Sequence, residues 1–233
     1  MSPSIFKTVL DAIYPPSCCA CGRRGSWWCE SCRTSVERPV KDLCPFCLSF
    51  HEPDKICSGN LPFTGLVALG YYHSQPLRAM ITDLKYRGVT APEKDVESFI
   101  SFCLSRRSQP LPWEQEQQII FVPMQLSSSR LRERGFNQAA WLTRRIVNVI
   151  APHAAIADML VREDRPIPQA SLEDADARHA NVRGAFTVTQ RIQGAVILVD
   201  DVITTGFTAA EAANALKKAG AERVYVLTLA IGK

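Results

Sequence analysis

From Leu61 onward the chain alternates short apolar runs with amphipathic stretches, a pattern typical of an α/β fold. The runs at residues 119–124 and 195–199 contain no alternating polar positions, as expected of central parallel strands covered on both faces. We expect strands at residues 66–72, 119–124, 156–161, 195–199 and 223–231, and helices at residues 76–86, after Pro92, and at residues 137–150 and 208–219.

The two helices nearest the start of this region are predicted from apolar positions spaced three and four apart. Residues 76–86 carry Leu77, Met80, Ile81 and Leu84 and should end at Gly88. The helix after Pro92 should bury Val96, Phe99, Ile100 and Cys103. Residues 106–118 are predicted to form a connection on the surface. Residues 162–183 are a polar segment that is too long for a simple connection between two elements.

Composition places the chain among globular proteins, with 46% hydrophobic and 21% charged residues. No apolar run approaches the roughly 20 residues needed to cross a bilayer, so no membrane insertion is expected. Residues 1–16 lack the order of a secretory signal, which predicts a cytoplasmic protein. A net charge of +4 neither requires nor excludes a polyanionic partner.

Cysteine divides the chain unevenly, because eight of the nine cysteines lie between Cys18 and Cys57. We therefore predict a Cys-rich zinc module at residues 1–60 and an α/β domain at residues 61–233. In a reducing compartment such a cluster indicates metal binding rather than disulfides. A redox-active dithiol would need a thioredoxin-like strand and helix around a Cys-x-x-Cys pair, and that context is absent.

The cysteine spacing contains three Cys-x-x-Cys pairs, each able to give two thiolates to a structural Zn²⁺. One site is expected from Cys18, Cys21, Cys29 and Cys32. A second would use Cys44, Cys47 and Cys57 with a fourth ligand; Asn60 stands three residues after Cys57, so either His51 completes the site or the site is lost. Spacing also leaves open that the first and third of these Cys-x-x-Cys pairs, here called knuckles, bind one ion together. Cys19 and Cys103 are predicted not to bind metal.

A phosphate site is predicted where the apolar run 195–199 is followed by Asp200 and Asp201 and then a Thr/Gly-rich loop. A helix that begins after such a strand presents backbone N–H groups to an anion. The cradle would be formed by Thr204, Thr205, Gly206, Phe207 and Thr208. Two adjacent carboxylates repel each other unless a hydroxyl-bearing ligand or a cation lies between them, which vicinal ribose hydroxyls and Mg²⁺ would satisfy.

Cationic side chains in two other segments are candidates for binding pyrophosphate. Arg130 and Arg134 follow the strand at residues 119–124, and bidentate guanidinium groups suit that anion. A solvated basic loop capped by Asn137 is the alternative. Lys85 is a third candidate, although a cation in the last turn of a helix is also ordinary helix-ending chemistry.

These motifs together resemble the ComF/GntX family, whose members join a zinc ribbon to a type I phosphoribosyltransferase domain. The resemblance covers the cysteine knuckles, the Leu84-Lys85-Tyr86-Arg87-Gly88 element, Val122-Pro123 with Arg134-Gly-Phe-Asn-Gln, a lid segment with Gln169 and Arg178, and the Asp200-Asp201 loop. It implies a type I phosphoribosyltransferase-like parallel sheet flanked by helices. Phe207 stands where the family has a small residue, and Pro166-Ile-Pro168 replaces a Thr-bearing lid sequence.

The resemblance implies that the chain is an enzyme that binds phosphoribosyl pyrophosphate with Mg²⁺ and transfers phosphoribosyl to a nucleobase-like acceptor. The acids would hold the ribose, residues 204–208 the 5′-phosphate, Arg130 and Arg134 the pyrophosphate, and Gln169 and Arg178 would lie in the lid. The family's association with competence and DNA utilisation implies single-stranded DNA or DNA-uptake proteins as partners. The alternative is a non-catalytic phosphoribosyl pyrophosphate sensor or a DNA-binding adaptor of the uptake machinery.

Overall fold

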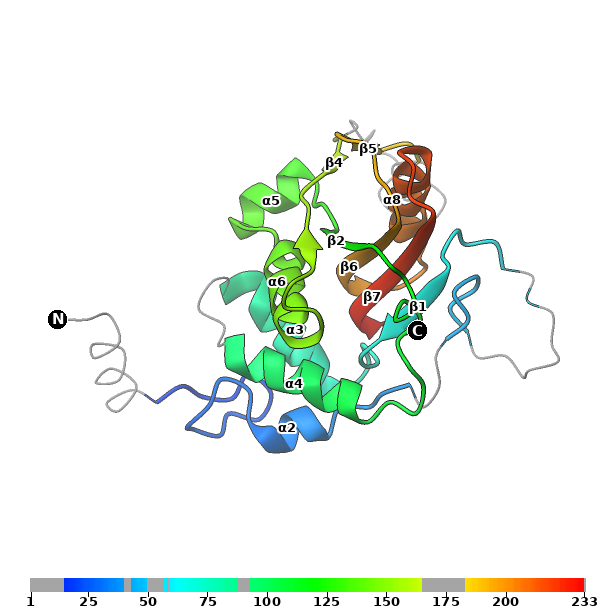
Figure 1. Cartoon of the computed structure of the whole chain (residues 1–233). Coiled ribbons are helices and arrows are strands. Elements are labelled where there is room, and N and C mark those ends of the chain that lie inside the picture. Colours follow the sequence, from blue (N-terminus) through cyan, green and yellow to red (C-terminus); the bar gives the residue numbers. More distant parts are fainter. Residues whose placement is uncertain are drawn as a thin grey trace.

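The computed structural model describes residues 15–39, 43–49, 57, 59–87, 93–164 and 183–232 of the chain. Its centre is a five-stranded parallel sheet in the order β1-β7-β6-β2-β3 (Figure 1). The strands are β1 Gly65–Ala68, β2 Ile119–Pro123, β3 Ala155–Ile156, β6 Ala195–Ile203 and β7 Arg223–Ile231. The fold is therefore α/β with a parallel sheet, as predicted.

Helices cover both faces of this sheet, because successive residues of the central strands point to opposite sides. In β6, Ile197 and Val199 join the core formed with α3 Gln75–Arg87, α4 Glu93–Ser105 and α6 Gln138–Ile150. Val196 and Leu198 join the core on the other face, against α8 Phe207–Lys218 (Figure 1). The predicted apolar face of α4 is buried at all four positions, Val96, Phe99, Ile100 and Cys103.

Two strand predictions need correction. Residues 156–161 do not form one strand: β3 ends at Ile156, and β4 Leu160–Arg162 pairs antiparallel with β5 Phe186–Val188 in a separate two-stranded sheet. The chain leaves the main sheet after Ala157, whose N–H still donates to the Phe121 carbonyl at 2.9 Å. The predicted strand 66–72 is also shorter, since β1 ends at Ala68 and Gly70 packs closely against Leu77 of α3.

The segment after β2 is not simply a loop, because it contains the helix α5 Ser128–Arg134. Ser127 caps α5 by accepting a hydrogen bond from the Arg130 N–H, and Gly135 ends it in the left-handed conformation at φ 73°. This short helix carries both arginines that the sequence singled out. Its position beside β2 places them at the carboxyl end of the sheet (Figure 1).

The first cysteine segment packs onto the large domain rather than around a core of its own. Trp28 is fully buried, and its ring centroid lies 4.9 Å from that of Phe99 in α4. Trp27 donates from Nε1 to the Asp83 carboxylate of α3, and an Arg33 to Asp95 ion pair of 2.7 Å joins α2 Glu30–Thr34 to α4. The boundary at residue 60 stays a prediction.

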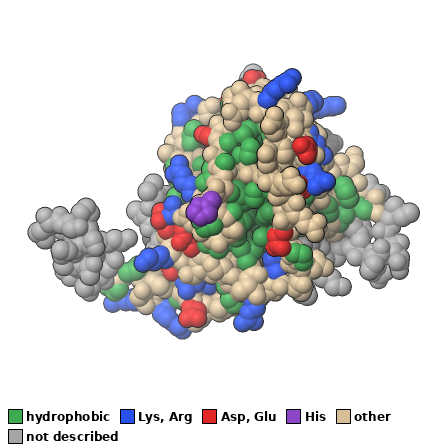
Figure 2. All heavy atoms as spheres, in the orientation of Figure 1, with side chains coloured by type: hydrophobic (Ala, Val, Ile, Leu, Met, Phe, Trp, Pro, Cys, Tyr) green, Lys and Arg blue, Asp and Glu red, His purple; other side chains and the backbone are tan. Residues whose placement is uncertain are grey.

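The surface carries charges of both signs. On the face drawn in Figure 2, Lys and Arg side chains are scattered around the margin with Asp and Glu between them, and the coloured residues there form no single basic stripe. Within the described ranges, none of the helices has the length and apolarity that crossing a bilayer requires.

Candidate functional site

A cavity of about 600 Å³ opens at the carboxyl ends of β2 and β6. It collects side chains from α3, the β2–α5 connection, α5, α6, β4 and the β6–α8 loop, which are distant in sequence. Of the predicted site residues, it is lined by Lys85, Arg130, Arg134, Asp200, Asp201, Thr204, Thr205, Gly206, Phe207 and Thr208. Gln169 and Arg178 lie outside the described residues.

The β6–α8 loop has the geometry of an anion cradle. Gly206 is the N-cap of α8 with φ 78°, a conformation that L side chains rarely adopt. A Cβ there would lie 2.9 Å from Leu61 Cδ1 and 3.0 Å from Leu48 Cδ1, so any larger residue would have to displace these leucine side chains. No side chain caps this helix, and its first-turn N–H groups have no partner within the helix. Thr204 and Thr205 are exposed beside them.

Phe207 is the one aromatic residue of the predicted cradle, residues 204–208. It is the first residue of α8, its side chain lines the cavity, and it is 42% exposed. Its ring adds apolar surface to the lining of the cavity.

The two acids lie inside β6 instead of after it, and their environments differ. Asp201 is 5% exposed; its Oδ2 lies 2.9 Å from Lys85 Nζ and 3.4 Å from Gln138 Nε2, and its Oδ1 accepts from the Val202 N–H at 3.0 Å. Asp200 accepts through Oδ1 from the Asp201 N–H at 2.8 Å. Burial, and after it the neighbouring charge of Asp201, raises the pKa of Asp200 well above its usual range.

The cavity wall opposite the acids is cationic. Arg130 is exposed on α5, whereas the Nε of Arg134 is buried without a hydrogen-bond partner among the described residues. Arg162, at the end of β4, is a third guanidinium on this wall. Burial, followed by the charge of Arg130, lowers the pKa of Arg162. The carboxylate of Asp164 accepts from the Ser128 N–H at 2.9 Å and so ties β4 to the start of α5.

Sequence reasoning missed Gln138, Arg162 and Tyr72, which also line the cavity. Gln138 stood inside the Arg134-Gly-Phe-Asn-Gln motif, and its signal was a polar side chain on the apolar face of a predicted helix. Arg162 began the predicted polar segment. Nothing in the local pattern of residues 66–72 distinguished Tyr72.

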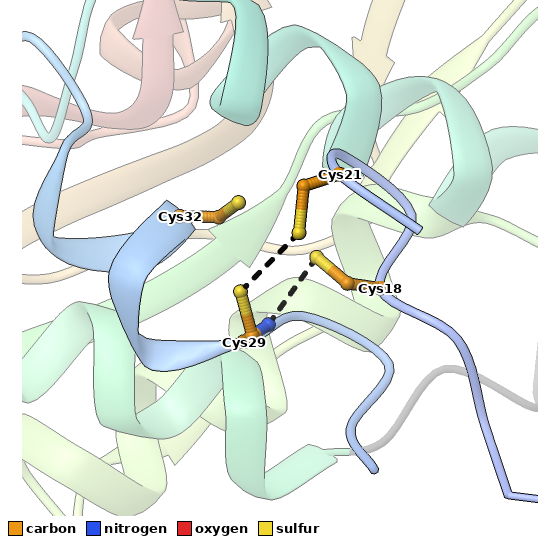
Figure 3. A group of neighbouring side chains, drawn as sticks. All are labelled: Cys18, Cys21, Cys29 and Cys32. Carbon is orange, nitrogen blue, oxygen red and sulfur yellow. Dashed lines mark hydrogen bonds between the residues drawn. The ribbon is translucent and has the colours of Figure 1, made fainter. Parts of the chain in front are cut away.

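The first cysteine cluster fits a tetrahedral metal. The sulfur atoms of Cys18, Cys21, Cys29 and Cys32 lie within 4.8 Å of one another, with 3.6 Å between those of Cys21 and Cys29 (Figure 3). Burial opposes ionisation of Cys18, but hydrogen bonds from backbone N–H groups, that of Cys29 first, bring its pKa down to about 6. Four such soft ligands suit a structural Zn²⁺. The first knuckle therefore meets the second and not the third.

A second cluster of three thiols consists of Cys44, Cys47 and Cys57, also within 4.8 Å of one another. Among the described residues no fourth His, Cys, Asp or Glu joins it, and Asn60 is not part of the group. His51 lies outside those residues. Cys19 and Cys103 belong to neither of these clusters of described residues, and burial raises the pKa of each to about 12.

Comparison with known proteins gives consistent relatives. No protein-family model matches the chain. The DNA utilization protein YhgH of Salmonella typhi is 31% identical over 209 residues, covering 86% of this chain and 88% of that protein. The competence protein ComFC of Streptococcus pneumoniae is 25% identical over 210 residues, covering 86% of each. Among solved structures, a hypoxanthine phosphoribosyltransferase from Staphylococcus aureus aligns with a TM-score of 0.37 and 13% identity, over 64% of this chain and 70% of that one.

Proposed function

Because the chain belongs to the family of the DNA utilization protein YhgH and the competence protein ComFC, we propose that it binds phosphoribosyl pyrophosphate with Mg²⁺ and transfers the phosphoribosyl group to an acceptor. The observation that carries this proposal is the convergence on one cavity of an anion cradle, an acid pair and three arginines. Each recognises a different part of that substrate. The combination is more specific than any one of its members.

The cradle and the acids account for the two ends of the ribose 5-phosphate unit. The N–H groups at the start of α8, with Thr204 and Thr205, bind the 5′-phosphate. Asp200, whose carboxyl lines the cavity, accepts from a ribose hydroxyl. The remaining anion, pyrophosphate, then extends toward Arg130 and Arg134.

Magnesium suits the acidic side of this cavity. Asp200 and Asp201 bring two carboxylates together, and Lys85 forms an ion pair with only one of them, Asp201. Asp200 would hold the ion together with oxygens of the substrate, since Mg²⁺ prefers carboxylate and phosphate oxygens. When bound, Mg²⁺ supplies charge neutralisation to the departing pyrophosphate.

The reaction exchanges one bond at C1 of the ribose. The bond from C1 to the pyrophosphate oxygen breaks, with its electron pair leaving on pyrophosphate, and the acceptor's lone pair forms the new bond to C1. The proton that the acceptor nitrogen loses passes to the departing pyrophosphate. Positive charge develops on the ribose ring and negative charge on the leaving oxygen. Preorganised guanidinium groups of Arg130 and Arg134 stabilise the latter, and a buried site strengthens that effect.

The acceptor is proposed to be nucleobase-like. Relatives of this chain are named for DNA utilization and competence, and breakdown of DNA supplies bases that a phosphoribosyltransferase returns to nucleotides. Phe207 and Tyr72 provide aromatic surface at the cavity on which a planar base can stack.

A second candidate function is phosphoribosyl pyrophosphate sensing without turnover, in an adaptor that contacts single-stranded DNA or uptake proteins. The observation that favours it is the neutralisation of Asp201 by Lys85 at 2.9 Å, which leaves one acid for the ligand. Binding alone needs no more than that.

Titration calorimetry of the zinc-loaded protein with phosphoribosyl pyrophosphate and Mg²⁺ tests the binding step. Pyrophosphate release is then measured against a panel of nucleobases and single-stranded DNA. Acceptor-dependent release that disappears in Asp200→Asn but persists in Glu222→Gln, an exposed acid far from the lining residues, supports the transferase. Binding without release supports the sensor, and absence of binding overturns both.

A further inference from the structure

Gln138 has a buried side-chain amide, and of its two polar atoms Nε2 has a hydrogen-bond partner whereas Oε1 has none among the described residues. It is the first residue of α6, is 2% exposed and lines the cavity. Its Nε2 donates to Asp201 Oδ2 at 3.4 Å. Its Oε1 is buried and has no hydrogen-bond partner among the residues that the structure describes. A buried acceptor without a partner is unfavourable, so this oxygen is free to accept a hydrogen bond from a ligand.

The side-chain amide of the preceding residue, Asn137, has partners for both of its polar atoms. Asn137 accepts at Oδ1 from the N–H groups of Ala139 and Ala140, and donates from Nδ2 to the Met124 carbonyl at 3.0 Å and to Gln125 Oε1 at 3.2 Å. Its role in capping α6 and fixing the β2–α5 connection is therefore complete within the protein. Gln138, one residue later, is different because it lines the cavity and its acceptor Oε1 has no partner among the residues that the structure describes.

Contacts around Asp201 hold the Gln138 amide in that orientation. Asp201 accepts from Gln138 Nε2 and lies 2.9 Å from Lys85 Nζ through the same oxygen, while its other oxygen accepts from the Val202 N–H. Because a carboxylate only accepts hydrogen bonds, the amide atom that contacts Asp201 must be the donor Nε2. Oε1 is then the atom left for a ligand.

Two acceptors are thus available to a ligand on the acidic side of the cavity, the carboxylate of Asp200 and Oε1 of Gln138. We propose that Gln138 accepts a hydrogen bond from a hydroxyl of the bound pentose phosphate and so makes the cavity select ribose over deoxyribose phosphates. Vicinal hydroxyls supply two donors, which matches two acceptors; a sugar lacking one hydroxyl leaves one of them unpaired. This inference rests on the proposed function and assigns it a sugar specificity.

The selectivity has a definite size. A neutral hydrogen bond in a buried site contributes about 0.5–1.5 kcal/mol, which corresponds to a preference of roughly 2- to 10-fold. Affinities of the full-length, zinc-loaded protein are measured by calorimetry for ribose 5-phosphate, 2-deoxyribose 5-phosphate and inorganic phosphate. The wild-type protein is expected to prefer ribose 5-phosphate over its deoxy analogue by a factor in that range.

Gln138→Met keeps the length of the side chain and removes both hydrogen-bonding atoms. The ribose preference is expected to fall to about 1 while the affinity for inorganic phosphate stays unchanged. Gln117→Met, at an exposed position outside the cavity lining, serves as the matched control and should leave the preference intact.

The outcomes separate this inference from the function on which it rests. A folded Gln138→Met protein that keeps the wild-type preference overturns the inference alone. So does a wild-type protein that binds phosphoribosyl pyrophosphate but does not discriminate between the two pentose phosphates. A wild-type protein that binds neither phosphoribosyl pyrophosphate nor ribose 5-phosphate overturns the proposed function as well.

Discussion

Leu48 packs against Gly206, so that a Cβ at position 206 would lie only 3.0 Å from Leu48 Cδ1. Leu48 follows Cys47 directly, and its N–H donates to the Cys44 carbonyl at 2.9 Å, within the second cysteine cluster. Its own φ of 61° is unusual for a residue with a branched side chain. Gly206 is the N-cap of α8 in the anion cradle. The segment that carries the second thiol cluster therefore packs, through Leu48, against the loop that we propose binds the 5′-phosphate.

Replacing Gly206 tests this contact. Gly206→Ala should lower the free energy of unfolding by more than the roughly 1 kcal/mol that a left-handed alanine costs, because Leu48 and Leu61 must also move. Gly135→Ala is the matched control, with φ 73° and nothing within 4 Å of the added methyl. Urea unfolding measures both. Equal losses in the two variants would show that the leucines yield without cost.

We expect the first cysteine cluster to hold one zinc ion, and we expect the packing of this segment against α4 to depend on that ion. Cys29→Ser should lose that metal, measured by elemental analysis after gel filtration, because three thiolates bind Zn²⁺ more weakly than four. Its tryptophan emission should shift to longer wavelength, since the fully buried Trp28 packs between the knuckle and Phe99 of α4. Cys103→Ser, a buried thiol outside the clusters, should retain the metal. Retention of the full zinc content by Cys29→Ser would place the metal elsewhere.

Burial of Asp200, and after it the neighbouring charge of Asp201, makes stability depend on pH in an unusual direction. The pKa of Asp200 is raised in the folded state above its ordinary value of 3.8, so the folded chain binds this proton more tightly than the unfolded chain. The stabilising contribution of that proton is complete below pH 3.8 and is lost as the pH rises through the folded-state pKa. Asp200→Asn should therefore raise the free energy of unfolding at pH 7.5, by about 1–2 kcal/mol, and flatten its pH dependence.

The neighbouring acid provides the contrast. Asp201→Asn should lower the free energy of unfolding at pH 7.5 by about 1–3 kcal/mol, because it leaves Lys85, whose side chain is 19% exposed, without its ion pair. Chemical denaturation across pH 4 to about 8 compares the two variants. Stabilisation by both substitutions would mean that the Lys85 contact contributes nothing to the fold.

Arg134 is expected to recognise the pyrophosphate and not the sugar phosphate. Its Nε is buried and has no partner within the part of the chain that the structure describes, and a hydrogen bond to a charged group contributes about 1.5–3 kcal/mol. Arg134→Met should weaken phosphoribosyl pyrophosphate binding by about 10- to 100-fold and leave ribose 5-phosphate affinity unchanged. Arg144→Met, exposed on α6, should change neither. An equal loss for both ligands would move Arg134 to the sugar end of the cavity.

Local sequence was sufficient for the main elements. The apolar periodicity predicted α3, α4, α6, α8 and the central strands, because each buries one face or both in a way that short-range spacing reveals. It failed at residues 156–161, where a single apolar stretch serves two different sheets. It also failed at Trp113, which lies in the predicted surface connection but is 4% exposed against Tyr225 of β7. Both predictions failed because contacts with residues far away in the sequence decide the structure at these positions.

The amino-acid sequence by itself determined which chemical groups the site contains: an acid pair, a Thr/Gly-rich loop, arginines and cysteine knuckles. Tertiary structure alone decided how they are used. It joined the first knuckle to the second, brought Gln138 to Asp201, and paired Lys85 with one acid while leaving the other at the cavity. The physical reason is that residue type and spacing specify local geometry. Burial, charge pairing and an unpartnered acceptor arise only when segments remote in sequence pack together.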